Sequence, residues 1–163
     1  MRLLLQTLSI LIVVTLVGGS GVVLLNKDIP DYPVPDAPWE AGTALDGQTF
    51  FTTDTILETQ DEVLDSFRFR DGKFQSSMCQ VYCDFGWSDY QTFVADGVLH
   101  FTATTSCPDA PHKVVFYGTV IDGTLSFEGT WTTRRWYWTQ QLNAVGSGTE
   151  TPTEAHIAAG ITS

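Results

Sequence analysis

The segment TTRRWYWTQQL, residues 132–142, concentrates side chains suited to binding a small molecule. Arginine pairs bidentately with carboxylate or phosphate and stacks on aromatic rings, while tryptophan offers a large apolar surface. A buried glutamine needs hydrogen-bond partners, and a ligand can supply them. The predicted ligand-binding residues are Trp131, Arg134, Arg135, Trp136, Trp138 and Gln140.

Motifs for catalysis and for cofactor binding are missing from the sequence. It has no glycine-rich phosphate loop, no Gly-x-Ser-x-Gly elbow and no His-Glu-x-x-His motif. We therefore predict no enzymatic activity, no cofactor and no metal site. His100 is expected on the outer face of a strand, beside Phe93, and His156 is expected to be a lone, inert histidine.

Two metal sites remain open as alternatives. The acidic run across residues 54–65 could bind calcium, although its spacing matches no calcium loop, and it otherwise indicates a solvated loop or short helix. A zinc site is the other alternative, although the spacing of its ligands is unusual. Its ligands would be Cys79, Cys83, Cys107 and His112.

Composition indicates one folded domain with appendages. The chain of 163 residues is 43% hydrophobic and holds ten Phe, five Trp and five Tyr, enough for a substantial core. The formal net charge is −11, from 19 acidic and 8 basic residues. A surface this acidic repels nucleic acid and anionic lipid headgroups, so neither is expected as a partner.

The N-terminus is predicted to be a transmembrane anchor over residues 1–25. Residues 3–25 carry no charge, and about 20 apolar residues suffice to cross a bilayer. The bulk of the chain is then expected outside the cytoplasm, tethered to the membrane. Cleavage near Gly19 or Gly21 as a signal peptide is an alternative, and retention in the cytoplasm is another.

Two further segments are predicted to lie outside the folded domain. Residues 26–44 are rich in proline, which favours an extended, semi-rigid linker. Residues 147–163 begin GSGTETPTE and are predicted to be a flexible tail, in which TEAHIAA is compatible with one helical turn. The domain itself is predicted to span residues 45–146.

The domain has the pattern of an all-β fold. Asp-Gly pairs at 71–72, 96–97 and 122–123 are each flanked by alternating apolar residues, which predicts two-residue hairpin turns. Sequential hairpins predict an eight-stranded up-and-down antiparallel barrel, with a two-sheet sandwich as the alternative. The predicted strands are 45–51, 64–70, 73–78, 89–95, 98–105, 113–121, 124–132 and 136–145.

The hairpin turns also predict the pairing of side chains inside the barrel. A turn at 122–123 pairs Gly118 with Phe127 and Phe116 with Gly129, so each glycine faces an aromatic ring. The other two hairpins give equally apolar inner faces. Their inward residues are Phe67 and Phe69 with Phe74, Ser76 and Met78, and Tyr90, Thr92 and Val94 with Leu99, Phe101 and Ala103.

Alternation of strand direction places the Asp-Gly turns at one closed end. The connections 52–63, 79–88, 106–112 and 132–135 then share the open end. Strand alternation points Trp131, Trp136, Trp138 and Gln140 inward there. In an oxidising compartment two of the three cysteines should pair. Cys83 and Cys107 lie in neighbouring connections, and the loop between them would contribute about 3 kcal/mol of stability.

Three segments resemble an uncharacterised group of secreted bacterial lipocalin-like (calycin) small β-barrel proteins. They are DGKFQSSMC at 71–79, FTATTS at 101–106 and GTVIDGTLSFEGTW at 118–131, and the resemblance covers about residues 45–145. The resemblance implies an eight-stranded barrel outside the cytoplasm and no established activity. In the similar proteins the cysteine at position 79 occurs without the other two, which agrees with a free Cys79.

The function predicted from these features is binding of a small ligand through the open end of a membrane-tethered barrel. Arg134 and Arg135, reinforced by Lys113, would meet an anionic or polar group of the ligand, unless they are solvated turn residues. The alternative is an accessory or assembly subunit of an envelope membrane complex. In that case the aromatic residues simply fill the barrel, and the GGSG segment lets a partner helix approach the anchor.

Overall fold

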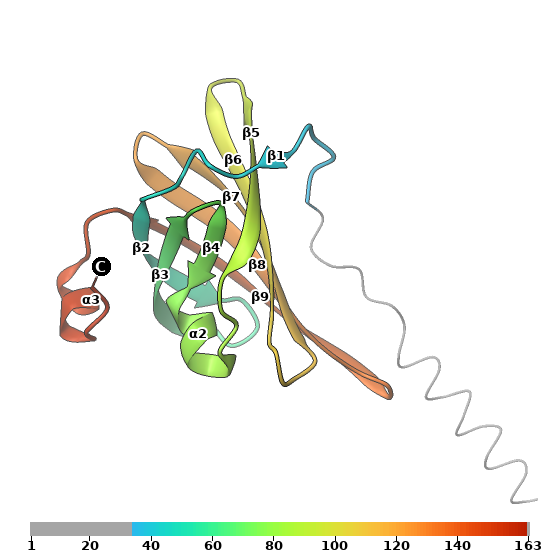
Figure 1. The fold of residues 1–163 in the computed structure, drawn as a ribbon. Helices are drawn as coiled ribbons and strands as arrows, with labels where there is room; N and C mark the ends of the chain where they lie inside the picture. The colour runs from blue at the N-terminus through green and yellow to red at the C-terminus, as the bar shows by residue number, and fades with distance from the viewer. Residues whose placement is uncertain (1–33, 163) are drawn as a thin grey trace, which may run out of the picture.

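The computed structural model describes residues 34–162, so the predicted anchor and residues 26–33 of the predicted linker lie outside the described residues. Among residues 34–162, no helix is long and apolar enough to cross a membrane. The described part is an all-β fold with two short helices (Figure 1). Its elements are β1 (Glu40–Ala41), β2 (Thr49–Ile56), β3 (Glu62–Arg70), β4 (Lys73–Ser76), α2 (Ser77–Cys83), β5 (Ser88–Ala95), β6 (Val98–Ser106), β7 (His112–Ile121), β8 (Thr124–Arg135), β9 (Trp138–Thr149) and α3 (Glu154–Ala158).

The strands form one antiparallel sheet that closes in a ring, in place of the two sheets of the sandwich alternative. The order is β5-β4-β3-β2-β9-β8-β7-β6, and β6 pairs again with β5. The contact between β4 and β5 is short, because only Lys73 and Phe74 of β4 have partners on β5. Strand β1 pairs with the exposed edge of β5 beyond that point, where Glu40 lies opposite Thr92. Closure leaves little unpaired edge backbone.

The three Asp-Gly hairpins form as the sequence predicts. Asp71, Asp96 and Asp122 all have positive φ, as do the glycines that follow them, which is the geometry of a type I′ turn. The predicted pairs are confirmed: Gly118 lies opposite Phe127 and Phe116 opposite Gly129. The short glycine side of each pair leaves room for the ring across from it.

The end of the ring that carries the Asp-Gly turns is closed by packed aromatic residues. Tyr90 seals it from the inside, since its hydroxyl donates to Asp46 Oδ1 at 3.0 Å and accepts from the Leu45 amide at 3.1 Å. The Asp46 carboxylate also accepts from the Gly72 amide at the β3–β4 turn. The fully buried aromatic residues of this end are Phe50, Phe67, Phe69, Phe74, Tyr90 and Phe101.

The predicted boundaries of the first and third strands were wrong. The first strand runs over Thr49–Ile56, so the connection predicted at 52–63 shrinks to a turn near 57–61. The third strand, predicted over 73–78, ends at Ser76, because the Ser76 hydroxyl accepts from the Cys79 amide and starts helix α2. The expected loop 79–88 is therefore partly helical.

One residue of the β5–β6 hairpin is placed differently from the prediction. Val94 pairs with Leu99 as predicted but is 67% exposed instead of facing the core. Figure 1 gives the reason, since the tip of this hairpin projects past the neighbouring strands and so has no interior behind it.

The C-terminal segment is part of the folded unit, which corrects the predicted flexible tail 147–163. Strand β9 continues to Thr149, where it pairs with both β2 and β8. The predicted helical turn exists as α3, which packs outside the ring. His156 on α3 is fully buried, and its Nε2 donates to the Thr52 carbonyl at 2.9 Å. It is therefore a structural residue that fixes the tail to β2.

We predict that Gly118 cannot accept a methyl group, whereas Gly129 can. A Cβ at Gly118 would lie 2.4 Å from the Phe101 ring and 2.5 Å from the Ser126 carbonyl. Gly118→Ala should therefore lower the free energy of unfolding by about 1–3 kcal/mol. A Cβ at Gly129 meets only ordinary contacts at 3.5 Å, so Gly129→Ala should stay within about 1 kcal/mol of the parent. Urea unfolding measures both, and equal losses would contradict the prediction.

Candidate functional site

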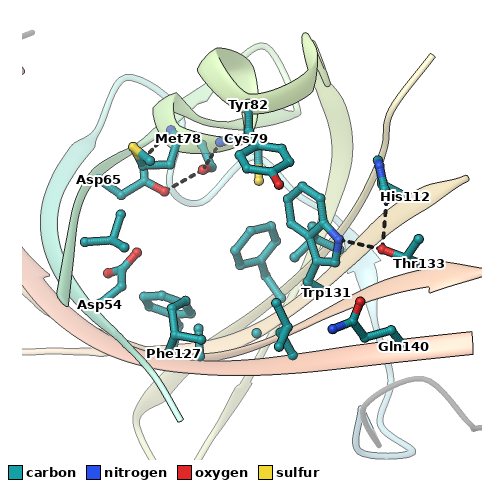
Figure 2. Close-up of a pocket in the computed structure, with 18 of the residues that line it drawn as sticks. Asp54, Asp65, Met78, Cys79, Tyr82, His112, Phe127, Trp131, Thr133 and Gln140 are labelled. Carbon is teal, nitrogen blue, oxygen red and sulfur yellow. Dashed lines mark hydrogen bonds between the residues drawn. The ribbon is translucent and has the colours of Figure 1, made fainter. Parts of the chain in front are cut away.

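The half of the ring opposite the Asp-Gly turns contains a cavity of about 470 Å³ (Figure 2). It is reached between helix α2 and the β8–β9 hairpin. Its polar lining is sparse, and its wall is mostly aliphatic and aromatic. The apolar wall includes Val63, Val114, Phe116, Phe127, Trp131 and Leu142.

Four of the six predicted ligand-binding residues line this cavity: Trp131, Arg135, Trp138 and Gln140. Trp131 is the most deeply set of the four. Its ring packs against Tyr82 and Phe85, with centroid distances of 4.9 and 5.2 Å, and its Nε1 donates to Thr133 Oγ1 at 3.1 Å. Thr133 Oγ1 also lies 2.9 Å from His112 Nδ1, which joins β7 and β8 at the mouth.

The other two predicted residues, Arg134 and Trp136, lie outside the cavity. The connection predicted at 132–135 does not exist, because β8 continues to Arg135 and a two-residue turn leads directly into β9. Strand alternation therefore turns Arg134 away from Arg135, and the Arg134 amide donates to the Pro111 carbonyl. Trp136 occupies the turn itself and is 82% exposed, not inside as predicted.

The β8–β9 hairpin also changes the environment expected for Gln140. Strand β7 starts at His112, which pairs with Thr133, so the part of the hairpin beyond Thr133 has no β7 neighbour. Figure 1 shows this hairpin extending well past the ring. Gln140 is consequently exposed at the entrance, and not buried as the sequence suggested.

The structure adds two buried carboxyl groups that the sequence analysis missed. Asp54 on β2 and Asp65 on β3 both line the cavity and are only 6% and 2% exposed. Thr52 pairs with Asp65 and Asp54 with Val63, so the two carboxyl groups are diagonal neighbours on the inner face. The acidic run was interpreted as a solvated loop, but alternation continued back from Phe67 would have placed Asp65 inside.

Asp65 is a satisfied structural carboxylate. It accepts hydrogen bonds from the hydroxyls of Ser76 and Ser77 and from the amides of Ser66 and Met78. These bonds connect β3 to the first turn of α2. Burial raises the pKa of Asp65, while the hydrogen bonds lower it and only partly offset the loss of hydration.

Asp54 differs because its Oδ1 atom is buried and has no hydrogen-bond partner. Burial raises the pKa of Asp54 to about 8, and repulsion from Asp65 adds to the effect. At neutral pH the carboxyl group is therefore largely protonated. Gly146 on β9 makes space for it, because a Cβ there would lie 2.5 Å from Asp54 Oδ1.

The predicted disulfide is confirmed. Cys83 is bonded to Cys107, with Cα atoms 5.6 Å apart, which joins the end of α2 to the β6–β7 connection beside the mouth. Cys79 is free and buried. The disulfide removes two ligands of the zinc alternative, and residues 34–162 contain no group of three or more His, Cys, Asp or Glu that could hold a metal ion. His100 stacks on Phe93 as expected.

Comparison with known protein families, curated protein sequences and solved structures finds no match to this chain. Function is therefore inferred from the geometry of the cavity and of the residues that line it.

We predict that Asp54 makes the protein less stable as the pH rises. Its pKa is 3.8 in a solvated chain and about 8 in the fold, so the folded state binds more protons across that window. Its stabilising contribution is complete below 3.8 and is lost as the pH rises through about 8, at no more than about 1.4 kcal/mol per pH unit.

Asp54→Asn should flatten this dependence without abolishing it, because the pKa of Asp65 is raised as well. Urea unfolding of both proteins at about pH 5 and about pH 8 provides the measurement. The matched variant Asp61→Asn, in the exposed β2–β3 turn, should show the same pH dependence of stability as the parent. A variant Asp54→Asn that loses as much stability as the parent would show that Asp54 is not the titrating group.

We further predict that Cys79 is unreactive in the folded protein. Burial raises the pKa of its thiol to about 12, so almost no thiolate exists at neutral pH. A disulfide reagent such as 5,5′-dithiobis(2-nitrobenzoate) should label the native protein slowly and the urea-unfolded protein rapidly, at one thiol. Cys79→Ala should remove that labelling. Rapid labelling of the native parent would refute the prediction.

Proposed function

We propose that the protein is a lipocalin-like barrel that binds one small, largely apolar molecule in the cavity at its open end. The cavity of about 470 Å³ is the observation that carries this proposal. It lies within the size range of small-molecule sites, and its few polar groups stand out against an apolar wall, which is typical of such sites. A barrel acting only as a spacer would be filled by side chains.

The unequal filling of the ring supports the proposal. Aromatic side chains occupy the closed half, whereas Gly129 and Ala144 face the cavity in the open half. These small residues pair with each other across β8 and β9. They leave space beside the Trp131–Leu142 pair, so a ring or chain of the ligand can take the place that larger side chains would fill.

The entrance provides polar contacts for the part of the ligand nearest to solvent. Arg135 takes the place of the predicted arginine pair, because Arg134 does not line the cavity. Gln140 and His112 line the cavity with it, and Trp138 offers a face on which a planar group can stack. Tyr82 on α2 closes the opposite side of the mouth.

The proposal includes the location predicted from the sequence, tethered by residues 1–25 with the folded unit outside the cytoplasm. The Cys83–Cys107 disulfide supports it, because disulfides persist in oxidising compartments. The chain enters the fold through β1, at the closed end. The closed end is then nearer the membrane, and the mouth points away from it.

A role as accessory subunit of a membrane complex is the second candidate. Exposed apolar side chains near the mouth favour it, because such surfaces often contact partners. They are Val81 and Tyr82 on α2 and Trp136 and Tyr137 in the β8–β9 turn. Native mass spectrometry of protein purified from its own membrane separates the two, since a partner subunit adds a large mass and a ligand adds a small one.

We predict that filling the cavity abolishes binding of an apolar probe. Ala144 lines the cavity, and its neighbour Val145 is 37% exposed on the outer face of the same strand. Ala144→Phe should weaken binding of N-phenyl-1-naphthylamine by at least about tenfold, which is about 1.4 kcal/mol. The matched change Val145→Phe should leave binding unchanged.

Fluorescence of the probe, titrated into the full chain in lipid nanodiscs with empty nanodiscs as blank, measures this affinity. Thermal unfolding of both variants verifies that they are folded. No binding by the parent, or equal binding by the parent and Ala144→Phe, would overturn the proposed function.

A further inference from the structure

One of the residues that line the cavity has a buried polar atom without a hydrogen-bond partner. Asp54 lines the cavity, and its Oδ1 atom, which lies next to Gly146, is buried and unpaired. The whole residue is 6% exposed. Leaving a buried polar group unpaired costs about 1–3 kcal/mol, so a ligand that pairs with it gains that interaction on binding.

Three classes of ligand fit this group poorly. An anion would form no ion pair with these two carboxyl groups and would be repelled by either of them when it is ionised, and a purely apolar molecule would leave Asp54 unpaired. A bare metal ion needs several ligands, and Asp65 already accepts four hydrogen bonds. An organic cation with an N–H donor fits, because it pairs with a carboxylate and keeps its apolar part on the wall.

We propose that the cavity selects a small organic amine, with its ammonium group donating to Asp54 beside Asp65 and its apolar body packed along Phe127, Trp131 and Leu142. This inference rests on the proposed function and specifies the chemical class of the ligand. The primary contact is the ion pair with Asp54. The Asp65 carboxylate adds a favourable field while it keeps its own hydrogen bonds to Ser76 and Ser77.

The arrangement of the wall supports this orientation. Figure 2 shows Asp54 and Asp65 on one side of the cavity, with Trp131, Thr133 and Gln140 on the other. The amine therefore has its charged group at the carboxyl side and its body directed toward the tryptophan and the mouth. The face of Trp131 also attracts a cation during entry.

Binding should change the protonation of Asp54. The free carboxyl group is largely protonated at neutral pH, because burial raises its pKa to about 8, and an ammonium ion favours the carboxylate. Complex formation should then release about one proton to the buffer. The other titratable or charged groups that line the cavity are Asp65 on β3, Cys79 and Tyr82 on α2, His112 on β7 and Arg135 on β8.

A matched series of probes tests the proposal. 1-Naphthylmethylamine, 1-naphthalenemethanol and 1-naphthoate share the same ring system and differ in carrying a cation, a neutral hydroxyl or an anion. Isothermal titration calorimetry with the full chain in lipid nanodiscs, and empty nanodiscs as blank, gives each affinity. We expect the amine to bind at least about tenfold more tightly than the alcohol, and the anion to bind most weakly.

Asp54→Asn should remove the preference for the amine while the alcohol keeps its affinity, because the change removes the group that can ionise on binding and preserves its shape. The control Asp61→Asn makes the same side-chain substitution at an exposed turn and should keep the preference. Titrations in two buffers of different ionisation enthalpy should show proton release with the amine in the parent protein and none in Asp54→Asn.

The outcomes distinguish this inference from the proposed function. If the alcohol binds the parent as tightly as the amine, or the naphthoate binds most tightly, the amine proposal is overturned while ligand binding stands. The same holds if Asp54→Asn keeps the preference. If none of the three probes binds the parent, both proposals fall.

Discussion

The structure depends on the closure of the sheet through β9. This strand pairs with β8 along one edge and with β2 along the other, so the first and last strands of the ring meet. The approach is close enough that a Cβ at Gly148 would lie 2.0 Å from the Phe51 carbonyl. Without that junction β2 and β9 would each expose an edge of unpaired backbone groups, and the interior would open to water. Helix α3 packs on the outside of β2 and β3, with His156 hydrogen-bonded to the backbone of β2.

Closure creates an interior with two unlike halves. Aromatic rings from β2, β3, β4, β5 and β6 fill the half near the Asp-Gly turns, and their edge-to-face contacts leave little space. The other half is bounded by β2, β3, β7, β8, β9 and helix α2, and there the small residues Gly129 and Ala144 keep a cavity open. Helix α2 is held over this half by the disulfide at its end and by Asp65 at its start. The rigid half therefore supports the half that we propose binds a ligand.

The buried carboxyl groups make this cavity chemically distinct from a simple apolar pocket. Asp65 contributes to structure, since it accepts four hydrogen bonds. Asp54 makes no such contribution through Oδ1, and its burial disfavours the charged form. Gly146 leaves space for the Asp54 carboxyl group. An apolar residue at position 54 would pack there without the dehydration cost of a buried carboxyl group. Because the buried Asp54 carboxyl group lowers the stability of the fold, we infer that it has a role in binding.

Local features of the fold could be predicted from the sequence alone. The Asp-Gly turns, the pairing of Gly118 with Phe127 and the Cys83–Cys107 disulfide follow from turn chemistry, two-residue alternation and cysteine position. The set of side chains that reach the cavity could not be predicted in this way, because it depends on tertiary contacts. Trp136 and Arg134 lie outside the cavity because β8 continues to a tight turn. Asp54 lines the cavity because β2 extends beyond residue 51. The Gly-Ser-Gly segment at 146–148 has a composition typical of a linker, but it forms part of β9, the strand that closes the ring. Alternation fixes the inner face of a strand, but strand length and ring closure depend on backbone partners distant in the chain.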